Sequence, residues 1–263
     1  MSTYLDRILV AHREAAALDV RPLDALVERA AACPPTRGFR DALRRIAAEG
    51  DVAVIAEVKR RSPSKGELAA DLDPAVLARQ YEQGGAACLS VLTDVEFFGG
   101  SPADLAAARA ACALPVLRKD FTVSAHDVCD ARLMGADCVL LIAAALTQSE
   151  LESLLALARR VGLDVLVEIH DEPELDRAVD AGADLIGVNQ RDLVTFAVDT
   201  ERALRMAPQM PAGVVRVAES GITGPADAAA LAGAGYHAVL VGEHLVTSGD
   251  PVAGVAALRQ ARR

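Results

Sequence analysis

The sequence has no tryptophan, and aromatic residues make up only 3% of its 263 residues. It has few cysteines, and their number is odd, with no C-x-x-C pair: Cys33, Cys88, Cys112, Cys129 and Cys138. The Met-Ser-Thr start does not have the charged and apolar regions of a signal peptide. We therefore expect reduced, mostly buried thiols in a cytoplasmic protein.

Long apolar runs and basic blocks are also missing. The longest apolar run, 138–146, is far shorter than a membrane span, so we expect no membrane association. The net charge is −10 and no Lys/Arg block is long enough to follow a phosphate backbone, which argues against nucleic-acid binding. The histidines are scattered and no Cys/His spacing matches a zinc site, so we expect no metal: His12, His126, His170, His237 and His244.

What the sequence does have is a hydrophobic content of 52%, enough for a large core. The Ala-rich first 48 residues show helical spacing, and we expect helices at 4–17, 22–32 and 39–48. These helices need a partner for their apolar stripes, so they should pack on the elements that follow. From residue 52 onward, apolar runs alternate with helical patterns.

The alternation predicts eight strands and seven helices between them. The expected strands are 52–59, 88–93, 116–120, 138–143, 164–169, 185–189, 215–219 and 238–242. The expected helices are 74–83, 102–111, 125–134, 148–161, 172–181, 200–206 and 225–234. Nearly continuous apolar strands are typical of parallel strands covered by helices.

Every second strand follows a helix that closes with glycine, at Gly85, Gly135, Gly182 and Gly235. This period, with no linker, predicts an α/β protein with one (βα)8 TIM barrel domain over 1–263, in which 1–48 is an N-terminal helical extension. An open doubly wound sheet is the alternative. That fold usually has G-x-G-x-x-G after its first strand, whereas residues 61–66 read R-S-P-S-K-G.

Polar side chains stand where most of these strands end, and in a barrel those ends form one mouth. Glu57 and Lys59 are two residues apart and therefore share a face of the first strand. The other candidates at this mouth are Ser62, Thr93, Asp94, Lys119, Asp120, Glu168, His170, Asn189, Arg191, Glu219 and Ser220. We expect His170 to be a polar rim residue and not a catalyst.

Buried charges must be paired or must shift their pKa, and we expect burial and neighbouring cations to lower the pKa of a lysine here toward neutrality. Such a lysine is suited to proton transfer or, for Lys119, to a Schiff base. A ring of salt bridges that closes the barrel is the purely structural alternative. The glycine loops at 220–225 and 241–244 precede helix starts, so they either cradle a phosphate or only make tight turns.

Seven motifs in this order closely resemble the indole-3-glycerol-phosphate synthase family, and the likeness runs from about residue 3 to the C-terminus. They are A-E-V-K-R-R-S-P-S-K-G (56–66), L-T-D-x-x-F-F-G-G-S (92–101), V-L-R-K-D-F (116–121), L-V-E-I-H (166–170), V-N-Q-R-D-L (188–193), A-E-S-G-I (218–222) and V-G-E-H-L-V (241–246). The resemblance implies ring closure, decarboxylation and dehydration of 1-(2-carboxyphenylamino)-1-deoxyribulose 5-phosphate to indole-3-glycerol phosphate, without a cofactor.

The resemblance also implies residue roles. Lys119 matches the general acid of ring closure, and Glu168, Glu57 and Lys59 match groups that move protons, with the division of steps left open. Glu219 and Asn189 match residues that orient the substrate. The remaining matches are contacts to the phosphate (Ser62, Lys59, Arg191, Ser220, Gly221, Gly242) and to the anthranilate ring (Phe98, Phe121). The alternative role for Phe98 and Phe121 is packing in the hydrophobic core.

Two departures from the family pattern stand out. Gln190 replaces a frequent Asn, and we expect little effect because it points to the opposite face of the strand. His244 replaces a frequent Ser near the phosphate, which bears on affinity and not on the reaction. We expect a monomer or a weak homodimer.

Two other kinds of function stay open at this point. One is another phosphosugar barrel enzyme, either a Schiff-base aldolase or phosphoribosylanthranilate isomerase. The isomerase would use a Cys/Asp acid–base pair at the ends of its first and its fifth or sixth strands, whereas the first strand here ends in Glu57 and Lys59, which argues against it. The other is a non-catalytic binding protein on the same fold, for which Lys119 would be dispensable.

Overall fold

The computed structural model describes residues 3–62 and 65–260, and its eight long strands close into one parallel barrel, as predicted. Residues 63 and 64 of the first motif lie outside the described residues. The strand order around the barrel is β1-β10-β9-β8-β7-β6-β5-β4, so neighbours in the sequence are neighbours in the barrel. The strands are β1 (Ala53–Val58), β4 (Cys88–Leu92), β5 (Val116–Lys119), β6 (Cys138–Ile142), β7 (Asp164–Ile169), β8 (Leu185–Asn189), β9 (Val215–Glu219) and β10 (Ala238–Val241).

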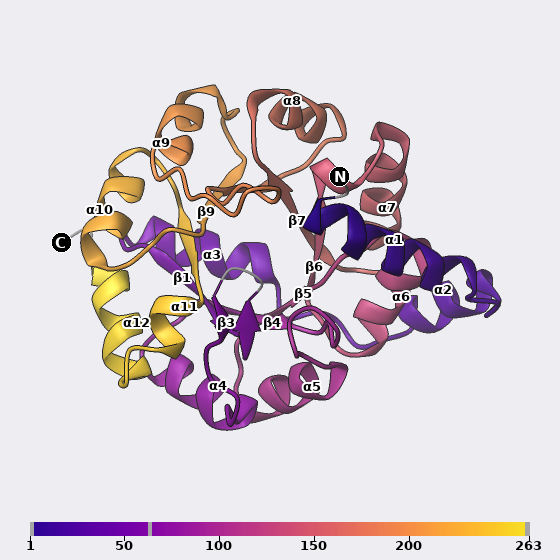
Figure 1. Ribbon diagram of the computed structural model, residues 1–263, viewed down its shortest axis with the longest axis horizontal. Coiled ribbons are helices and arrows are strands. Elements are labelled where there is room, and N and C mark those ends of the chain that lie inside the picture. The colour runs from indigo at the N-terminus through magenta and orange to yellow at the C-terminus, as the bar shows by residue number, and fades with distance from the viewer. Residues whose placement is uncertain (1–2, 63–64, 261–263) are drawn as a thin grey trace.

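Helices cover the barrel from outside, and most begin at the predicted residue (Figure 1). Side-chain caps fix several of these starts: Asp73, Ser101 and Ser124 each accept a backbone N–H of the first turn. The helices between strands are α4 (Pro74–Gln83), α5 (Pro102–Ala111), α6 (Ala125–Leu133), α7 (Gln148–Arg160), α8 (Glu172–Asp180), α9 (Arg202–Met206) and α10 (Pro225–Gly233).

Several short elements were not predicted. A hairpin of β2 (Arg61–Ser62) and β3 (Gly66–Glu67) follows the first strand. Single turns of 3₁₀ helix occur at η1 (Ala143–Ala145) and η2 (Ala207–Gln209). After the last strand come α11 (Glu243–Val246) and α12 (Pro251–Arg259), which packs against α4 and so closes the ring of helices between the last and first strands.

The predicted N-terminal helices form and pack on the barrel in two places: α1 (Tyr4–Ala17), α2 (Leu23–Ala31) and α3 (Phe39–Ala48). Helix α3 contacts β1, β4 and β9 and lies behind the barrel in Figure 1, where it closes the amino-terminal end. The α2 helix packs on α6. Helix α1 lies beside α6 and α7 in Figure 1, and its Arg13 pairs with Glu150 of α7.

The barrel interior is a packed apolar core. Ile55, Leu117 and Leu140 are among the largest fully buried side chains of the molecule. The cysteines are all free thiols, three of them buried and Cys33 and Cys112 half-buried. Among the described residues, no helix combines the length and apolarity that crossing a lipid bilayer requires.

Candidate active site

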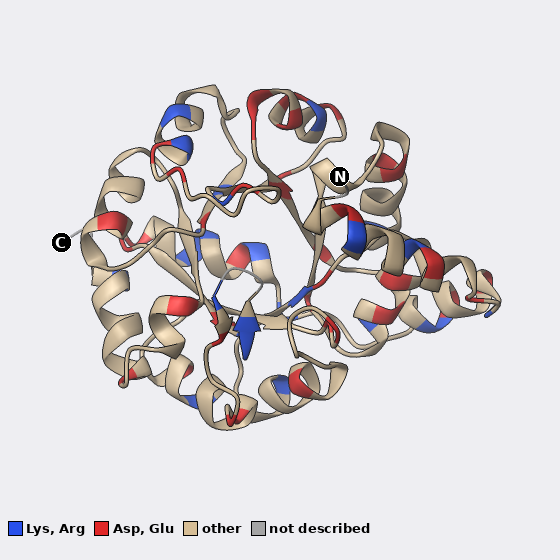
Figure 2. Cartoon of the chain, in the orientation of Figure 1, with Lys and Arg blue, Asp and Glu red and all other residues tan. Residues whose placement is uncertain are grey.

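The carboxyl-terminal ends of the strands surround a cavity of about 590 Å³, a size typical of small-molecule sites. Figure 2 shows basic and acidic segments on several of the strands and loops near the middle of the barrel. Thr93 and His170 do not line the cavity, whereas all of the residues to which the family resemblance assigns a role do: Glu57, Lys59, Ser62, Phe98, Lys119, Phe121, Glu168, Asn189, Arg191, Glu219, Ser220, Gly221 and Gly242. The structure therefore brings together side chains from seven strands or the loops that follow them.

Lys119, at the end of β5, is the cation at the centre of this cavity. Its Nζ lies 3.0 Å from Glu168 Oε2 and 3.6 Å from Glu219 Oε2. Burial alone would lower the pKa of Lys119, but the charges of Glu168, Glu219 and Glu57 outweigh it and raise the pKa well above the ordinary value. The predicted lowering is therefore wrong for Lys119: its neighbours are carboxylates and not cations, so it stays an ammonium ion.

Glu168, in β7, accepts hydrogen bonds from two of the other predicted residues. Lys119 Nζ and Asn189 Nδ2 each donate a hydrogen bond of 3.0 Å to its carboxylate. Burial would raise the pKa of Glu168, but Lys119, His170 and Asn189 stabilise the anion and hold its pKa well below the usual range. Asn189 also accepts the backbone N–H of Arg191 at 3.0 Å, which fixes the loop after β8.

Glu219, at the end of β9, has the opposite electrostatic character although it lies in the same cluster. Burial and the charge of Glu168 raise the pKa of Glu219, so the carboxyl group holds its proton more tightly than an exposed glutamate does. Its Oε1 atom has no hydrogen-bond partner within the described part of the chain. A Cβ at Gly187 would lie 2.1 Å from this oxygen, so the neighbouring strand must carry glycine there. The cluster thus pairs an anionic Glu168 with a proton-bearing Glu219.

Glu57 and Lys59 lie on one face of the chain, as predicted, and form an ion pair of 2.6 Å. Ser90 Oγ also donates to Glu57 at 3.3 Å. The backbone of Gly242 packs directly on this pair, since a Cβ there would lie 2.4 Å from Glu57 Oε1 and 3.0 Å from Lys59 Nζ. The Lys59 ammonium therefore lies beside the turn that follows β10, where a phosphate was predicted.

The turn after β9 has a backbone that ordinary residues rarely adopt. Ser220 has φ of 65° and Gly221 has φ of 72°. A Cβ at Gly221 would also lie 2.6 Å from Val198 Cγ1. Successive backbone N–H groups in a turn can bind an anion, and both residues of this turn line the cavity. The glycine is therefore required by the turn and by the close approach of its neighbour.

The side chain of Gln190 forms a hydrogen bond with the backbone of this turn. It is buried, and its Nε2 donates to the Ser220 carbonyl at 2.8 Å. It does not line the cavity, which agrees with its predicted orientation, but its contact with the turn was not predicted. His244 does line the cavity.

An apolar wall faces the charged cluster. The rings of Phe98 and Phe121 lie 6.2 Å apart and are inclined by 38°. Leu140 and Ile142 of β6 complete this side of the cavity. No site residue was predicted in β6, because no polar residue stands at the end of that strand.

Two histidine contacts were also missed. His170, expected at the rim, lies behind Glu168 instead, with Nε2 3.4 Å from Glu168 Oε1 and Nδ1 3.1 Å from Glu174 Oε2. Burial would lower the pKa of His170, but these two carboxylates raise it to about 9. His12 of α1 reaches Asp94 over a sequence separation of 82 residues, and no local pattern indicates such a contact.

The chain was compared with known proteins. The family model described as indole-3-glycerol phosphate synthase matches residues 5–258. Indole-3-glycerol phosphate synthase of Mycolicibacterium smegmatis is 53% identical over 98% of this chain and 94% of its own length. Indole-3-glycerol phosphate synthase 1 of Streptomyces coelicolor is 56% identical over 90% of this chain and 86% of its own length.

Two solved structures share the fold at low identity. The tryptophan synthase alpha subunit of Legionella pneumophila is 15% identical, with a TM-score of 0.63 over 87% of this chain and 99% of its own. A thiamine phosphate pyrophosphorylase of Pyrococcus furiosus is 16% identical, with a TM-score of 0.59 over 80% of this chain and 95% of its own. These likenesses concern the barrel alone. The family model and the relatives above half identity show that the chain belongs to the indole-3-glycerol phosphate synthase family.

Proposed function

We propose that the chain closes the indole ring of 1-(2-carboxyphenylamino)-1-deoxyribulose 5-phosphate, with Lys119 as the general acid. Family membership makes it a lyase, a carboxy-lyase of tryptophan biosynthesis. The observation that carries the residue assignment is the position of the Lys119 ammonium, between Glu168 and Glu219 in a cavity that the turns at Ser220–Gly221 and Gly242 also line.

Ring closure turns the substrate ketone into an alkoxide, which needs a proton at once. The ammonium of Lys119 is suited to donate it, because Glu168 and Glu219 keep it charged and hold it in place. The same raised pKa argues against the Schiff-base alternative, since an amine must lose its proton before it attacks a carbonyl. Loss of carbon dioxide then releases the carboxyl group of the substrate.

Dehydration needs a proton for the leaving hydroxyl and a base for the hydrogen that is removed. The anionic Glu168 is suited to be the base, and the Glu57–Lys59 pair lines the same cavity as a second proton-transfer group. Asn189 and Glu219 orient these groups, since Asn189 bonds Glu168 and Glu219 lies against Lys119.

Phosphate binding is assigned to the side chains of Ser62, Lys59 and Arg191 and to the turns at Ser220–Gly221 and Gly242. The left-handed turn and the neighbouring Lys59 support this assignment. Phe98 and Phe121 pack on the anthranilate ring, supported by their places in the cavity wall.

We also propose that the chain works without a cofactor, in the cytoplasm, as one barrel with its helical extension and as a monomer or weak homodimer. The free thiols of all five cysteines support a reducing compartment.

The test is the appearance of indole fluorescence when the purified protein meets the carboxyphenylamino sugar phosphate. The absence of tryptophan keeps the protein background low at indole wavelengths. Fluorescence that grows with enzyme concentration supports the proposal. Substrate binding without any indole product would contradict it, and a borohydride-trapped adduct on Lys119 would favour the Schiff-base alternative.

A further inference from the structure

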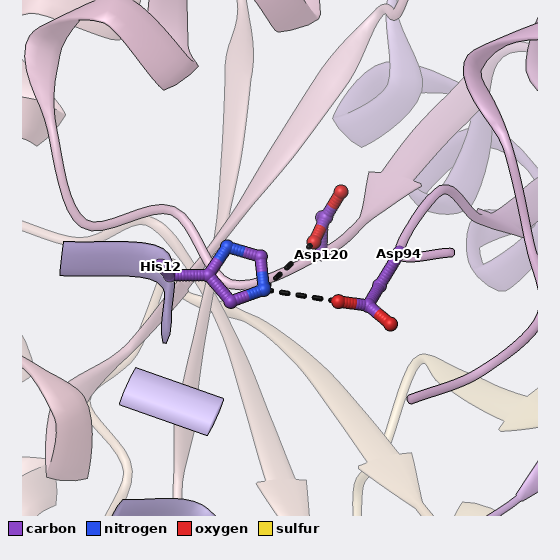
Figure 3. Close-up of side chains that lie close together, drawn as sticks. All are labelled: His12, Asp94 and Asp120. Atoms are coloured by element: carbon purple, nitrogen blue, oxygen red, sulfur yellow. Dashed lines mark hydrogen bonds and ion pairs between the residues drawn. The ribbon is translucent and has the colours of Figure 1, made fainter. Parts of the chain in front are cut away.

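One contact joins the N-terminal extension to the cavity. His12 extends from α1, and its Nε2 lies 3.0 Å from Asp94 Oδ2 and 3.9 Å from Asp120 Oδ1 (Figure 3). Asp94 follows β4 and Asp120 follows β5, and both line the cavity. The His12 side chain is 20% exposed, whereas the two carboxylates are almost fully buried. A single imidazole therefore bridges α1 and two strand ends.

The same imidazole packs on the aromatic wall. Its ring lies 5.5 Å from the ring of Phe121, which in turn lies 6.2 Å from Phe98. The carboxylate of Asp94 also fixes that wall, because its Oδ1 accepts the backbone N–H groups of Phe97 at 2.6 Å and Phe98 at 3.1 Å. His12 thus touches both the wall and one of the groups that position it.

The charges around His12 favour a cation. The negative charges of Asp94, Asp120 and Asp127 of α6 all favour the protonated form of His12. The guanidinium of Arg118 forms an ion pair with Asp120 at 3.0 Å. Burial alone would lower the pKa of His12, but the three carboxylates raise it above the usual histidine value of 6.5. On α1 itself, the neighbouring Arg13 pairs with Glu150.

We propose that His12 is a positioning residue for the anthranilate part of the site: as an imidazolium ion it ties α1 to Asp94 and Asp120 and so fixes the wall of Phe98 and Phe121. This rests on the proposed function of that wall. Deprotonation weakens the tie, because a neutral imidazole beside two buried carboxylates loses the ion pair. The N-terminal extension is then part of the substrate site and not only a cover for the barrel.

A bound cation is the other reading of this cluster, since the ligand atoms of the three side chains lie within 4.8 Å of one another. The existing bonds argue against it. Asp120 is already occupied by Arg118, Thr93 and the N–H of Phe121, and the contact between His12 and Asp94 has the length of a hydrogen bond.

The test compares wild type with His12→Lys, which keeps a cation at all working pH values, and His12→Asn, which has none. KM and kcat for the carboxyphenylamino sugar phosphate are measured from pH 6 to 9. The sign follows from the raised pKa: the tie is complete below pH 6.5 and is lost as pH rises through the pKa of folded His12. The wild-type KM should therefore rise over that window.

For His12→Asn, we expect KM to be about fivefold higher at low pH and nearly equal to wild type at high pH, with kcat changed less than about twofold. His12→Lys should keep a low KM to higher pH than wild type does. His126→Asn, which changes a histidine away from the cavity, is the matched control and should follow the wild-type profile.

Several results would overturn this role. They are an unchanged KM profile in His12→Asn, a His12→Lys profile that follows wild type, and a profile that a chelator or added Mg²⁺ or Zn²⁺ shifts. Wild type without turnover would refute the proposed function instead. Thermal melts of His12→Asn and wild type give a second readout that needs no substrate: the difference in melting temperature should shrink as pH rises above 6.5.

Discussion

The two ends of the barrel both bury charge, but they arrange it in opposite ways. At the amino-terminal end, Asp137 is fully buried, accepts the backbone N–H groups of Arg37 and Val116 at 2.8 Å each, and pairs with Arg109. At the carboxyl-terminal end, Glu219 Oε1 has no partner among the described residues. A fully bonded buried charge stabilises one structure, whereas a crowded and incompletely bonded cluster has capacity left for a substrate.

The comparison teaches that buried charge alone does not mark a site. Asp137 and Glu219 are equally buried, yet Glu219 shares its cavity with Lys119 and Glu168. What distinguishes the active end is a cavity, like charges held close together, and pKa values moved in opposite directions for Glu168 and Glu219. Substitutions at the two ends should therefore separate activity from stability.

The largest effect on catalysis is expected for Lys119→Ala. Loss of the general acid should lower kcat by about 10⁴-fold, or ~5.4 kcal/mol, at the upper range for such groups. Substrate affinity should stay within about tenfold, or 1.4 kcal/mol. Indole fluorescence measures turnover, and equilibrium binding of the substrate measures affinity. Unchanged turnover with lost binding would contradict the acid role.

At the other end, Asp137→Ala should lower stability and leave catalysis intact. Removing this carboxylate leaves Arg109 and two backbone N–H groups without their partner, which should lower the free energy of unfolding by about 3–5 kcal/mol. Urea unfolding measures the loss, and kcat of the folded fraction should stay within about twofold. If Asp137→Ala does not fold, the isosteric Asp137→Asn serves instead. A large fall in kcat with normal stability would contradict the assignment of Asp137 to stability and not to catalysis.

Changes in the anion cradle should weaken binding more than turnover. Gly221→Asp adds a clash with Val198 and a negative charge where a phosphate is proposed, so we expect KM to rise by about 100-fold, or ~2.7 kcal/mol. Ser62→Ala removes one donor and should raise KM by about tenfold or less. Initial rates over a range of substrate concentrations give KM and kcat for both variants. A fall in kcat with an unchanged KM would place the phosphate elsewhere.

A pH-dependent effect on stability is expected for Glu219→Gln. Folding raises the pKa of Glu219 from 4.5 to about 8, so between these values the folded state keeps a proton that the unfolded state has lost. The free energy of unfolding of wild type should therefore fall as pH rises from about 4.5 to about 8. Glu219→Gln should remove this contribution, so its stability relative to wild type should increase with pH. An equal slope for both proteins would mean that Glu219 is ionised throughout.

Much of the fold could be predicted from the sequence. The strands β7, β8 and β9 and the helices α4 and α5 begin and end at the predicted residues. Their apolar runs, proline and N-cap residues act over a few neighbouring positions, so local sequence suffices to place them. The β2–β3 hairpin and α11 were missed because elements of two to four residues are too short to show a period.

The site was predictable where polar residues stand at strand ends. Barrel topology brings those ends together, so Lys119 and Glu168 could be placed in one cavity without coordinates. His12, Leu140 and Gln190 could not be placed in this way. His12 comes from outside the repeating unit, Leu140 lies within an ordinary apolar strand, and Gln190 acts through a backbone carbonyl.

By itself, the sequence determined which segments are strands and helices, their order, and the set of polar residues at the mouth, because each follows from neighbours along the chain. The tertiary structure alone decided which state each charge adopts. Burial was expected to lower the pKa of a lysine at this mouth, but the pKa of Lys119 is raised, since a pKa depends on the distances to Glu168, Glu219 and Glu57, and these partners come from three other strands.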